Sequence, residues 1–391
     1  MHVLNLLSLN ILFIYSVALS LLYLCGCAKT ESESVSTVAV PKNTLVFVST
    51  DLLFTSSELL VLDLDTQRIE SLLPKQSGDF VIYADQGRLF AVNRKKQLLN
   101  IREIFIKDGE FHLGKQMSLP SDFSGDPHGL FVLDDEVVGL LGYNSHQIVV
   151  YDLKKAQSIQ VIDSVTNVPG GFDFRPESFV RHEQSYFILH QGYSGDFTET
   201  ASAAIYGFQW NESSMKLVPL SDSSLSFNEL RSHLPAKFLP YRDGYLINGL
   251  CYSWLSSCKA AVDLFTPGDA GLNPVEITIT DGVFAYGDQV GSGNLIYGQF
   301  GESSNDTVTL SSLDISAGVK DVIHTYDDVN DDGYADLGFL HLSGDTLYFS
   351  VPKTQRQSHF YTYKNSKKEL LMTMPYFPNS SVLVKDYVFD F

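Results

Sequence analysis

A pair of apolar runs recurs seven times along this chain, and this repetition restricts the possible folds more than any other feature. The first runs are NTLVFVST from Asn43, GRLFAVN from Gly87, DEVVGLL from Asp135, QSYFILHQ from Gln184, DGYLING from Asp243, GNLIYGQ from Gly293 and GDTLYFSV from Gly344. The second runs are ELLVLDLD from Glu58, LNIREIFI from Leu99, HQIVVYDL from His146, AAIYGFQW from Ala203, KAAVDLF from Lys259, DTVTLSSLD from Asp306 and SHFYTYK from Ser358. Successive copies begin 41–59 residues apart, and no convincing amphipathic helix lies between them.

Short β-branched and aromatic runs separated by Gly, Asp, Asn and Ser turns predict an all-β fold. Each repeat has room for four strands: one before the first run, the two runs themselves, and one after. Seven such units predict a seven-bladed β-propeller over residues 43–391, in which each sheet buries both faces against its neighbours. The unequal spacing leaves six or eight blades open. A string of immunoglobulin-like domains is the alternative, but the chain has no Pro-rich linkers at the spacing it requires.

The two ends of the repeat region look complementary. The chain enters the first unit at its second strand, and the final segment SSVLVKDYVFDF from Ser380 supplies a spare strand. Pairing these ends would complete the first blade and remove an open sheet edge.

The first residues predict export from the cytoplasm. Residues 3–25 carry no charge and end in Leu24-Cys25-Gly26-Cys27, which resembles the lipobox of bacterial lipoproteins. The resemblance implies a signal peptide over 1–26, lipid attachment (diacylglyceryl and palmitate) to Cys27, and, because Ala28 follows, sorting to the outer membrane. An uncleaved signal anchor is the alternative, since about 20 apolar residues also span a bilayer. Residues 27–42 are rich in Ser, Thr and Glu and predict a flexible tether.

Charge and cysteine content agree with an envelope location. With 46 Asp and Glu against 27 Lys and Arg, the net charge of −19 argues against nucleic acid as a partner. Beyond the signal peptide and Cys27, only Cys251 and Cys258 remain, and a disulfide between them could close the loop CYSWLSSC in an oxidising periplasm. Two free thiols are the alternative.

Three stretches carry a family resemblance: residues 46–66, 89–94 and 126–153. The last of them, DPHGLFVLDDEVVGLLGYNSHQIVVYDL, resembles the blade motif of the YncE/YVTN-type propellers. The resemblance is clearest over residues 44–210. It implies a propeller, but its motifs are structural and imply little about activity.

In a propeller, the connections between blades and those between the second and third strands of a blade emerge on one face. The longer loops of this chain fall in these two classes: 119–127, 164–176, 191–202, 220–236, 250–258 and 325–335. Variable loops on a rigid scaffold are where binding residues concentrate. We therefore expect a ligand- or protein-binding module whose partner is a small ligand or an envelope protein.

The segment DVNDDGYADLG from Asp328 predicts a calcium site. Its candidate ligands are the side chains of Asp328, Asn330, Asp332 and Asp336 and the carbonyl of Tyr334. Because Phe339 stands where an EF-hand has its bidentate Glu, the segment resembles instead the calcium loops of FG-GAP propellers, which implies a structural Ca²⁺. An acidic turn without metal is the alternative.

Weaker candidates for chemistry lie where the innermost strands are expected to begin. They are Asp79, His128, Glu177 and Asp336, with Asn144, His146 and His190 nearby. Tyr193, Phe197, Tyr252 and Trp254 on the same-face loops could form an aromatic ligand platform, or could only pack those loops. Carboxylates and imidazoles so placed could hold a divalent metal or act as acid and base; they could equally be the ordinary polar lining of a wet channel. Lactonase-like propellers use a central metal, so a metal-dependent hydrolase or lactonase is the rival to a non-enzymatic binding module.

Overall fold

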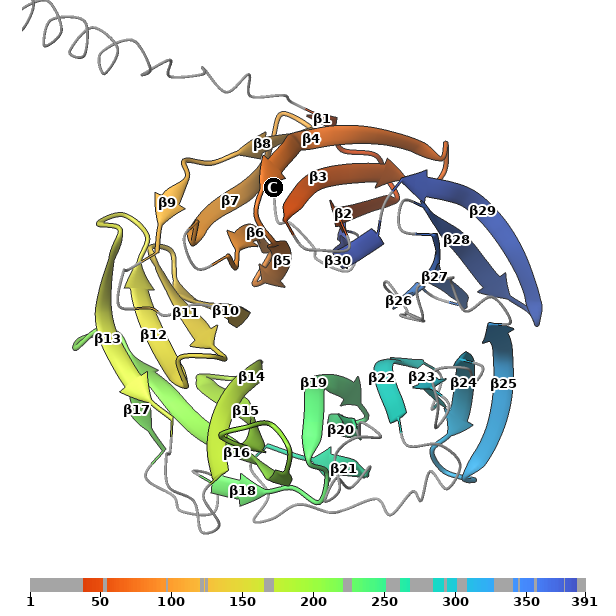
Figure 1. Cartoon of the computed structure of the whole chain (residues 1–391). Coiled ribbons are helices and arrows are strands. Elements are labelled where there is room, and N and C mark those ends of the chain that lie inside the picture. Colours follow the sequence, from red (N-terminus) through yellow and green to blue (C-terminus); the bar gives the residue numbers. More distant parts are fainter. Residues whose placement is uncertain are drawn as a thin grey trace, which may run out of the picture. The chain divides into compact units, whose positions relative to one another are not determined.

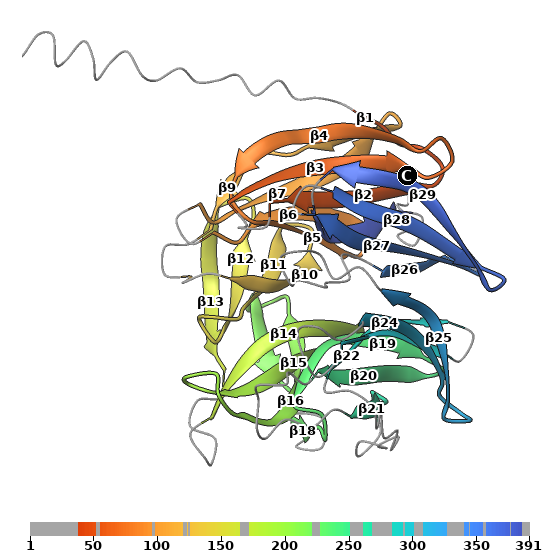
Figure 2. The same cartoon turned by 45° about the vertical axis from the view of Figure 1, so that its right-hand side comes forward.

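Seven antiparallel sheets surround a common axis in this protein (Figure 1). The structure, a computed structural model, describes residues 38–384 apart from 52–54, 96–97, 120–122, 124–125, 165–171, 221–226, 251–260, 268–283, 292–293, 301–307, 327–339, 344, 355–356 and 376. The fold is therefore the seven-bladed β-propeller that the repeat predicted, and the turned view in Figure 2 shows the blades around the ring.

The blades follow one another in chain order, and the strands of each blade succeed one another from the axis outward. Blade one contains β30 (Phe377–Leu383), β2 (Thr44–Thr50), β3 (Ser56–Asp63) and β4 (Arg68–Ser77). Blade two contains β5 (Phe80–Asp85), β6 (Arg88–Asn93), β7 (Asn100–Lys107) and β8 (Glu110–Leu113), with β9 (Met117–Ser118) paired to β7 and β1 (Val38–Ala39) paired to β8. Blade three contains β10 (Pro127–Asp134), β11 (Val137–Gly142), β12 (Gln147–Asp152) and β13 (Gln157–Asp163).

The remaining four blades complete the ring. Blade four contains β14 (Phe172–His182), β15 (Ser185–Ser194), β16 (Thr200–Asn211) and β17 (Lys216–Pro219), with β18 (Phe227–Glu229) paired to β16. The described part of blade five contains β19 (Leu234–Tyr241), β20 (Gly244–Leu250) and β21 (Val262–Phe265). Blade six contains β22 (Phe284–Gly291), β23 (Asn294–Phe300), β24 (Val308–Asp314) and β25 (Val319–Tyr326). Blade seven contains β26 (Leu340–Ser343), β27 (Thr346–Thr354), β28 (Gln357–Lys364) and β29 (Lys367–Pro375).

The two recurring apolar runs are the second and third strands of every blade. The first runs form β2, β6, β11, β15, β20, β23 and β27, and the second runs form β3, β7, β12, β16, β21, β24 and β28. Apart from β21, which among the described strands pairs only with β20, these middle strands pair on both sides, so their side chains are among the most buried in each sheet. Because they are apolar, these strands are the part of each repeat that can be recognised in the sequence.

The end of the chain closes the ring, as the sequence predicted. Strand β30 pairs with β2, placing Leu45 opposite Leu383 and Val46 opposite Val382. Leu383 keeps only 1% of its surface exposed. Blade one is thus built from both ends of the propeller region, and the inner edge of β2 is paired.

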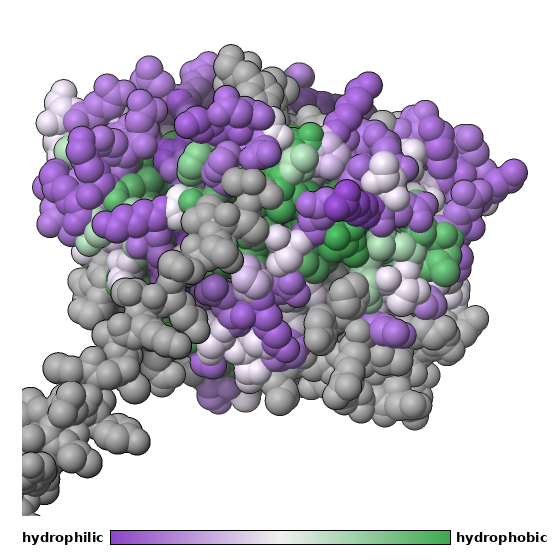
Figure 3. All heavy atoms as spheres, turned by 90° about the horizontal axis from the view of Figure 1, so that it is seen from above, coloured by the Kyte–Doolittle hydropathy of each residue, from purple (hydrophilic) through white to green (hydrophobic). Residues whose placement is uncertain are grey.

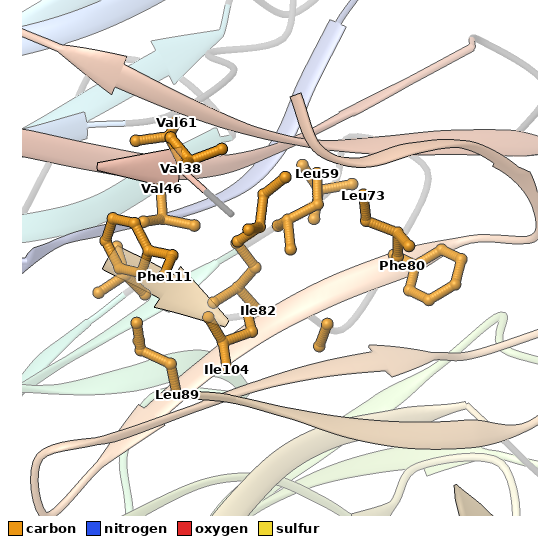
Figure 4. Packing of buried hydrophobic residues seen from close by; sticks show 14 of the residues in the cluster. Val38, Val46, Leu59, Val61, Leu73, Phe80, Ile82, Leu89, Ile104 and Phe111 are labelled. Atoms are coloured by element: carbon orange, nitrogen blue, oxygen red, sulfur yellow. The ribbon is translucent and has the colours of Figure 1, made fainter. Parts of the chain in front are cut away.

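The core lies between neighbouring blades rather than inside any one of them. Figure 4 shows Val46 and Val61 of blade one packed near Ile82 and Leu89 of blade two. Successive side chains of a strand point to opposite faces. Accordingly Phe47, beside Val46 in β2, packs in a different cluster with residues of blade seven.

The described chain joins the propeller earlier than its composition predicted. Val38 pairs with Phe111 of β8 and is 4% exposed. A tether reaching to Lys42 is therefore too long, because β1 is already held on the outer edge of blade two.

The side of the ring on which β1 and β4 lie is largely hydrophilic where it is described (Figure 3). Figure 3, seen from the side on which β1 and β4 lie, shows polar residues over much of the described surface, with separate hydrophobic areas between them. Within the described residues, no helix has the length and apolar character needed to cross a membrane.

Candidate functional site

The inner strands of blades three and four are each interrupted by a bulge just after a proline. In β10 the register shifts between Pro127 and Gly129, and in β14 it shifts between Pro176 and Ser178. A bulge adds one residue to a strand and re-aims its side chain. The extra residues are His128 and Glu177. A similar shift follows Pro235 in β19.

Five charged residues from blades two to four form what we call the axial cluster. Asp79 immediately precedes β5, Arg94 follows β6, Asp126 precedes β10, His128 lies in β10, and Glu177 lies in β14. Asp79, Asp126 and His128 lie at or near the start of an inner strand, Glu177 lies at the bulge in the middle of β14, and Arg94 lies in a connection between second and third strands. Four of the five therefore lie toward the face that the sequence predicted as the loop face, and Glu177 reaches them from the inner strand of blade four.

The axial cluster is an unbroken chain of alternating charges. Arg94 donates two hydrogen bonds to Oδ2 of Asp79, at 2.7 and 3.1 Å, and its Nη1 lies 3.6 Å from Oδ1 of Asp126. His128 places Nε2 3.3 Å from Oδ2 of Asp126 and Nδ1 2.7 Å from Oε2 of Glu177. The five side chains keep 16–31% of their surface exposed, so solvent and small solutes reach them.

Electrostatics keep His128 protonated. Burial alone would lower the pKa of His128, but the charge of Glu177 and the hydrogen bonds to Asp126 and Glu177 outweigh it and raise the pKa to about 9. Burial tends to raise the pKa of Asp126, yet His128 and Arg94 together hold it below its usual value. Burial raises the pKa of Asp79 in spite of Arg94.

An aromatic ring fixes the orientation of the imidazole. Tyr143 stacks on His128 with ring centroids 4.1 Å apart and planes 9° from parallel. The Tyr143 hydroxyl donates to Oε1 of Gln191 at 3.0 Å, and Gln191 in turn donates to the carbonyl of Pro235 at 2.8 Å. His128 is thus held by a chain of contacts that reaches from blade three to blade five.

Arg175, in β14, is a buried guanidinium beside this cluster. It is 5% exposed, and the centre of its guanidinium lies 4.2 Å from the Phe197 ring and 5.3 Å from the Tyr143 ring. Nη1 lies 3.4 Å from Oδ1 of Asn144. Among the described residues, Nε has no hydrogen-bond partner and no carboxylate forms an ion pair with Arg175. Most of its donors therefore remain available in the plane of the group.

The residue that covers Arg175 has a strained backbone. Phe197 lies in the turn between β15 and β16 and has a φ of 60°. A bulky side chain in the left-handed region costs of the order of 1–3 kcal/mol, and such outliers concentrate at functional sites. Phe197 is also 42% exposed, so its ring lies between Arg175 and solvent.

The other residues that the sequence singled out have diverse surroundings. Asn144 joins the cluster through a 3.1 Å hydrogen bond to Asp126. His146 lies 4.0 Å from Asp173, and burial and the charge of Arg175 lower its pKa. Tyr193 is 7% exposed and packs on Phe197 with ring centroids 5.3 Å apart.

His190 corrects one expectation. It is 2% exposed, its ring meets the edge of Tyr206 at 4.9 Å, and burial lowers its pKa to about 4. It is a neutral histidine inside blade four and does not present its ring on the loop face.

Several predicted sites lie outside the described residues. They are the lipidation site Cys27, the disulfide pair Cys251 and Cys258, the loop aromatics Tyr252 and Trp254, and the calcium loop with Asp328, Asn330, Asp332, Tyr334 and Asp336.

Asp79, His128 and Glu177 do not fit the metal site that the sequence allowed. Asp79 is bonded to Arg94, and both nitrogens of His128 face carboxylate oxygens. A protonated imidazole has no lone pair for a metal. Within the described part of the chain, no three Asp, Glu, His or Cys side chains gather as metal ligands.

Four residues of the site had no direct signal in the sequence: Arg94, Asp126, Tyr143 and Arg175. Each lies close to a strand end on the loop face, but so do many polar residues that have no such role. The repeated proline before His128 and Glu177 was a usable signal, because proline is tolerated in inner strands mainly at bulges.

We expect His128 to titrate near pH 9. Its folded pKa is raised above the ordinary value of about 6.5, so its contribution to stability is complete below pH 6.5 and disappears as the pH rises through 9. Two-dimensional NMR of the imidazole protons measures this directly, and Glu177→Gln should move the midpoint downward. His190, with its opposite shift, is an internal reference. A midpoint near 6.5 for His128 in the unmodified protein would contradict the charge chain.

Comparisons with known proteins agree on the fold. The sequence matches no protein-family model and no curated protein. A periplasmic gluconolactonase of Pseudomonas aeruginosa aligns with 89% of this chain and 100% of its own, with a TM-score of 0.60 and 12% identity. Putative 6-phosphogluconolactonases of Bacteroides uniformis and Bacteroides fragilis align with 87% of this chain and with 98% and 97% of theirs, with TM-scores of 0.58 and 0.57 and identities of 11% and 12%.

Such low identities show the fold alone. The propeller prediction is confirmed, whereas the resemblance to YncE/YVTN-type propellers in particular stays a prediction.

Proposed function

We propose that this propeller binds a small polyhydroxylated acid on its loop face, beside the axial cluster. The observation that carries the proposal is Arg175, a buried guanidinium that makes no ion pair with a described carboxylate and lies at the edge of a charge network. Burial lowers the pKa of Arg175 in spite of the charge of Asp173. Burying a charge is costly, so a ligand carboxylate or phosphate would relieve an existing penalty.

The neighbouring groups favour hydroxyls on the same ligand. Asp126 and Glu177 are partly exposed carboxylates with oxygen lone pairs left beyond their contacts with His128. They accept hydrogen bonds well and would repel a second anionic group. A molecule with one acidic end for Arg175 and hydroxyls for these two carboxylates satisfies both requirements, which describes a sugar acid.

Removing the guanidinium should abolish most of this binding. We expect Arg175→Gln to weaken the binding of D-gluconate at least tenfold, since losing a buried charged hydrogen-bond partner costs about 2–5 kcal/mol. Arg68→Gln, at an exposed arginine on the outer strand β4, is the matched control and should bind like the unmodified protein. Isothermal titration calorimetry measures both, after circular dichroism has shown that the variants are folded. Equal affinity in the two variants, or no binding by the unmodified protein, would refute the proposal.

Hydrolysis of a lactone at this site is the second candidate. It is favoured by the 2.7 Å contact between His128 and Glu177, which pairs a proton donor with a carboxylate base. The solved structures named as gluconolactonases support it only as an analogy of fold. In this mechanism Glu177 takes a proton from the attacking water, and protonated His128 donates a proton to the leaving ring oxygen.

A pH-stat assay with δ-gluconolactone separates catalysis from binding. If the site is catalytic, Glu177→Gln should lose at least a hundredfold in kcat, because general-base catalysis contributes about 10²–10⁴-fold, and should still bind gluconate. A rate no higher than the spontaneous hydrolysis would rule out this second candidate and leave the binding module.

The envelope location stays part of the proposal. Cys27 would carry the lipid and hold the protein on the outer membrane, with the periplasm as the site of the Cys251–Cys258 disulfide. Labelling with radioactive palmitate tests the anchor, because Cys27→Ala should lose the label. The loop from Asp328 would hold a structural Ca²⁺, and an identical melting temperature in calcium and in chelator would exclude it.

A further inference from the structure

A hollow lies between blades three and four, on the face of the propeller opposite the predicted loop face. Its volume is about 500 Å³, and it is lined by the end of β14, the turn that follows it, and the end of β16. These are the ends of first and third strands, whereas the residues of the axial cluster lie before β5, after β6, at the start of β10 and in the middle of β14. The two sites are therefore independent.

The floor of this hollow is a rigid part of the core. Tyr186 is 2% exposed and donates a hydrogen bond to the carbonyl of Val132 in the neighbouring blade at 3.1 Å. Leu133, also in the lining, is 7% exposed. The shape of the hollow is thus fixed by contacts between blades.

Trp210 lines the hollow and has an unused donor. Its ring packs against the core cluster shared by blades three and four. Its Nε1 is buried and has no hydrogen-bond partner among the described residues. An unsatisfied buried donor costs about 1–3 kcal/mol, so its presence in the wall of a hollow calls for an acceptor from outside the chain.

The rest of the polar lining is dominated by amides. Gln184, Gln209 and Asn211 contribute three, and Nε2 of Gln209 lies 3.5 Å from Oε1 of Gln184. The lining contains one cation, Arg181, and one anion, Glu212, so its formal net charge is zero. Each amide offers donors and an acceptor side by side.

We propose that this hollow binds a neutral saccharide of about two sugar units. Adjacent hydroxyls of a pyranose both donate and accept, which matches the amides, and the C–H face of the ring packs on an indole. A balanced charge disfavours an ionic ligand. A volume of 500 Å³ lies within the range of small-molecule sites.

Tryptophan fluorescence offers a direct test, because the chain contains only Trp210 and Trp254. In Trp254→Phe, all indole emission comes from Trp210. We expect a saturable change in this emission with at least one of maltose, cellobiose and N,N′-diacetylchitobiose at millimolar concentrations. Sorbitol, an open-chain polyol, controls for solvent effects and should give no saturable change.

Substitutions assign the signal to the hollow. Gln209→Ala should weaken the affinity at least tenfold, and Gln157→Ala, at an exposed glutamine of blade three, should leave it unchanged. Trp210→Phe keeps an aromatic ring but removes the donor, so calorimetry should show weaker binding there as well. Arg175→Gln should leave the saccharide affinity intact, which separates this site from the axial cluster. Flat titrations with all three disaccharides, or equal affinities for Gln209→Ala and Gln157→Ala, would overturn the proposal.

Discussion

Deleting residues 377–391 should leave a protein that aggregates or melts far below the full-length chain. The deletion removes β30, the innermost strand of blade one, and exposes the edge of β2 to which it pairs. Val382 and Leu383 are 6% and 1% exposed, and each contributes roughly 1.5–3 kcal/mol of hydrophobic burial. The free edge of β2 would also be a template for pairing with other chains.

The matched control is a deletion of residues 385–391 only, which leaves β30 intact. Differential scanning calorimetry and size-exclusion chromatography compare the two truncations with the full chain. Closure by β30 would be unimportant if the longer deletion gave a monomer with an unchanged melting temperature.

Gly139→Val should destabilise the protein by about 3 kcal/mol or more through overpacking of the core. A Cβ at Gly139 would lie 2.1 Å from Cζ of Phe131, which is fully buried. Phe131 cannot move aside easily, because it packs on Phe179 at 5.0 Å and on Tyr186 at 5.3 Å. The strain therefore passes to the packing between blades three and four.

Gly195→Val serves as the comparison, since nothing lies within 4 Å of a Cβ there. Urea unfolding followed by circular dichroism gives both free energies. A similar loss in the two variants would indicate that the close contact with Phe131 has no special role.

The alternation of side chains along each strand accounts for much of what the sequence predicted. The alternation of β2, with Val46 packed toward blade two and Phe47 toward blade seven, is a direct consequence of side chains pointing to opposite faces of a strand. Such residues must be apolar at every position, so they appear as continuous runs. The recurrence of these runs predicted the number of blades, and the spare strand from Ser380 predicted ring closure.

The local sequence pattern did not predict where the propeller begins. Residues 38–42 follow a polar stretch that is typical of a tether, yet Val38 is buried against β8. The two residues of β1 are too few to form a recognisable pattern. Their pairing depends on the exposed edge of a strand about seventy residues away.

The candidate site shows which features the sequence alone determined and which ones depended on the tertiary structure. By itself the sequence determined the seven-bladed scaffold, the face on which the long loops emerge, and the placement of Asp79 and His128 near the starts of inner strands, whereas Glu177 lies at a bulge in the middle of β14. It could not assign partners, because the contacts of His128 come from Asp126 on its own blade and Glu177 on the next. Only the tertiary structure decided that His128 is protonated, that His190 is a core residue, and that Arg175 is buried without an ion pair to a described carboxylate. The reason is physical: a strand pattern depends on neighbours one or two positions away, whereas a pKa or an ion pair depends on distances between blades that the closure of the ring sets.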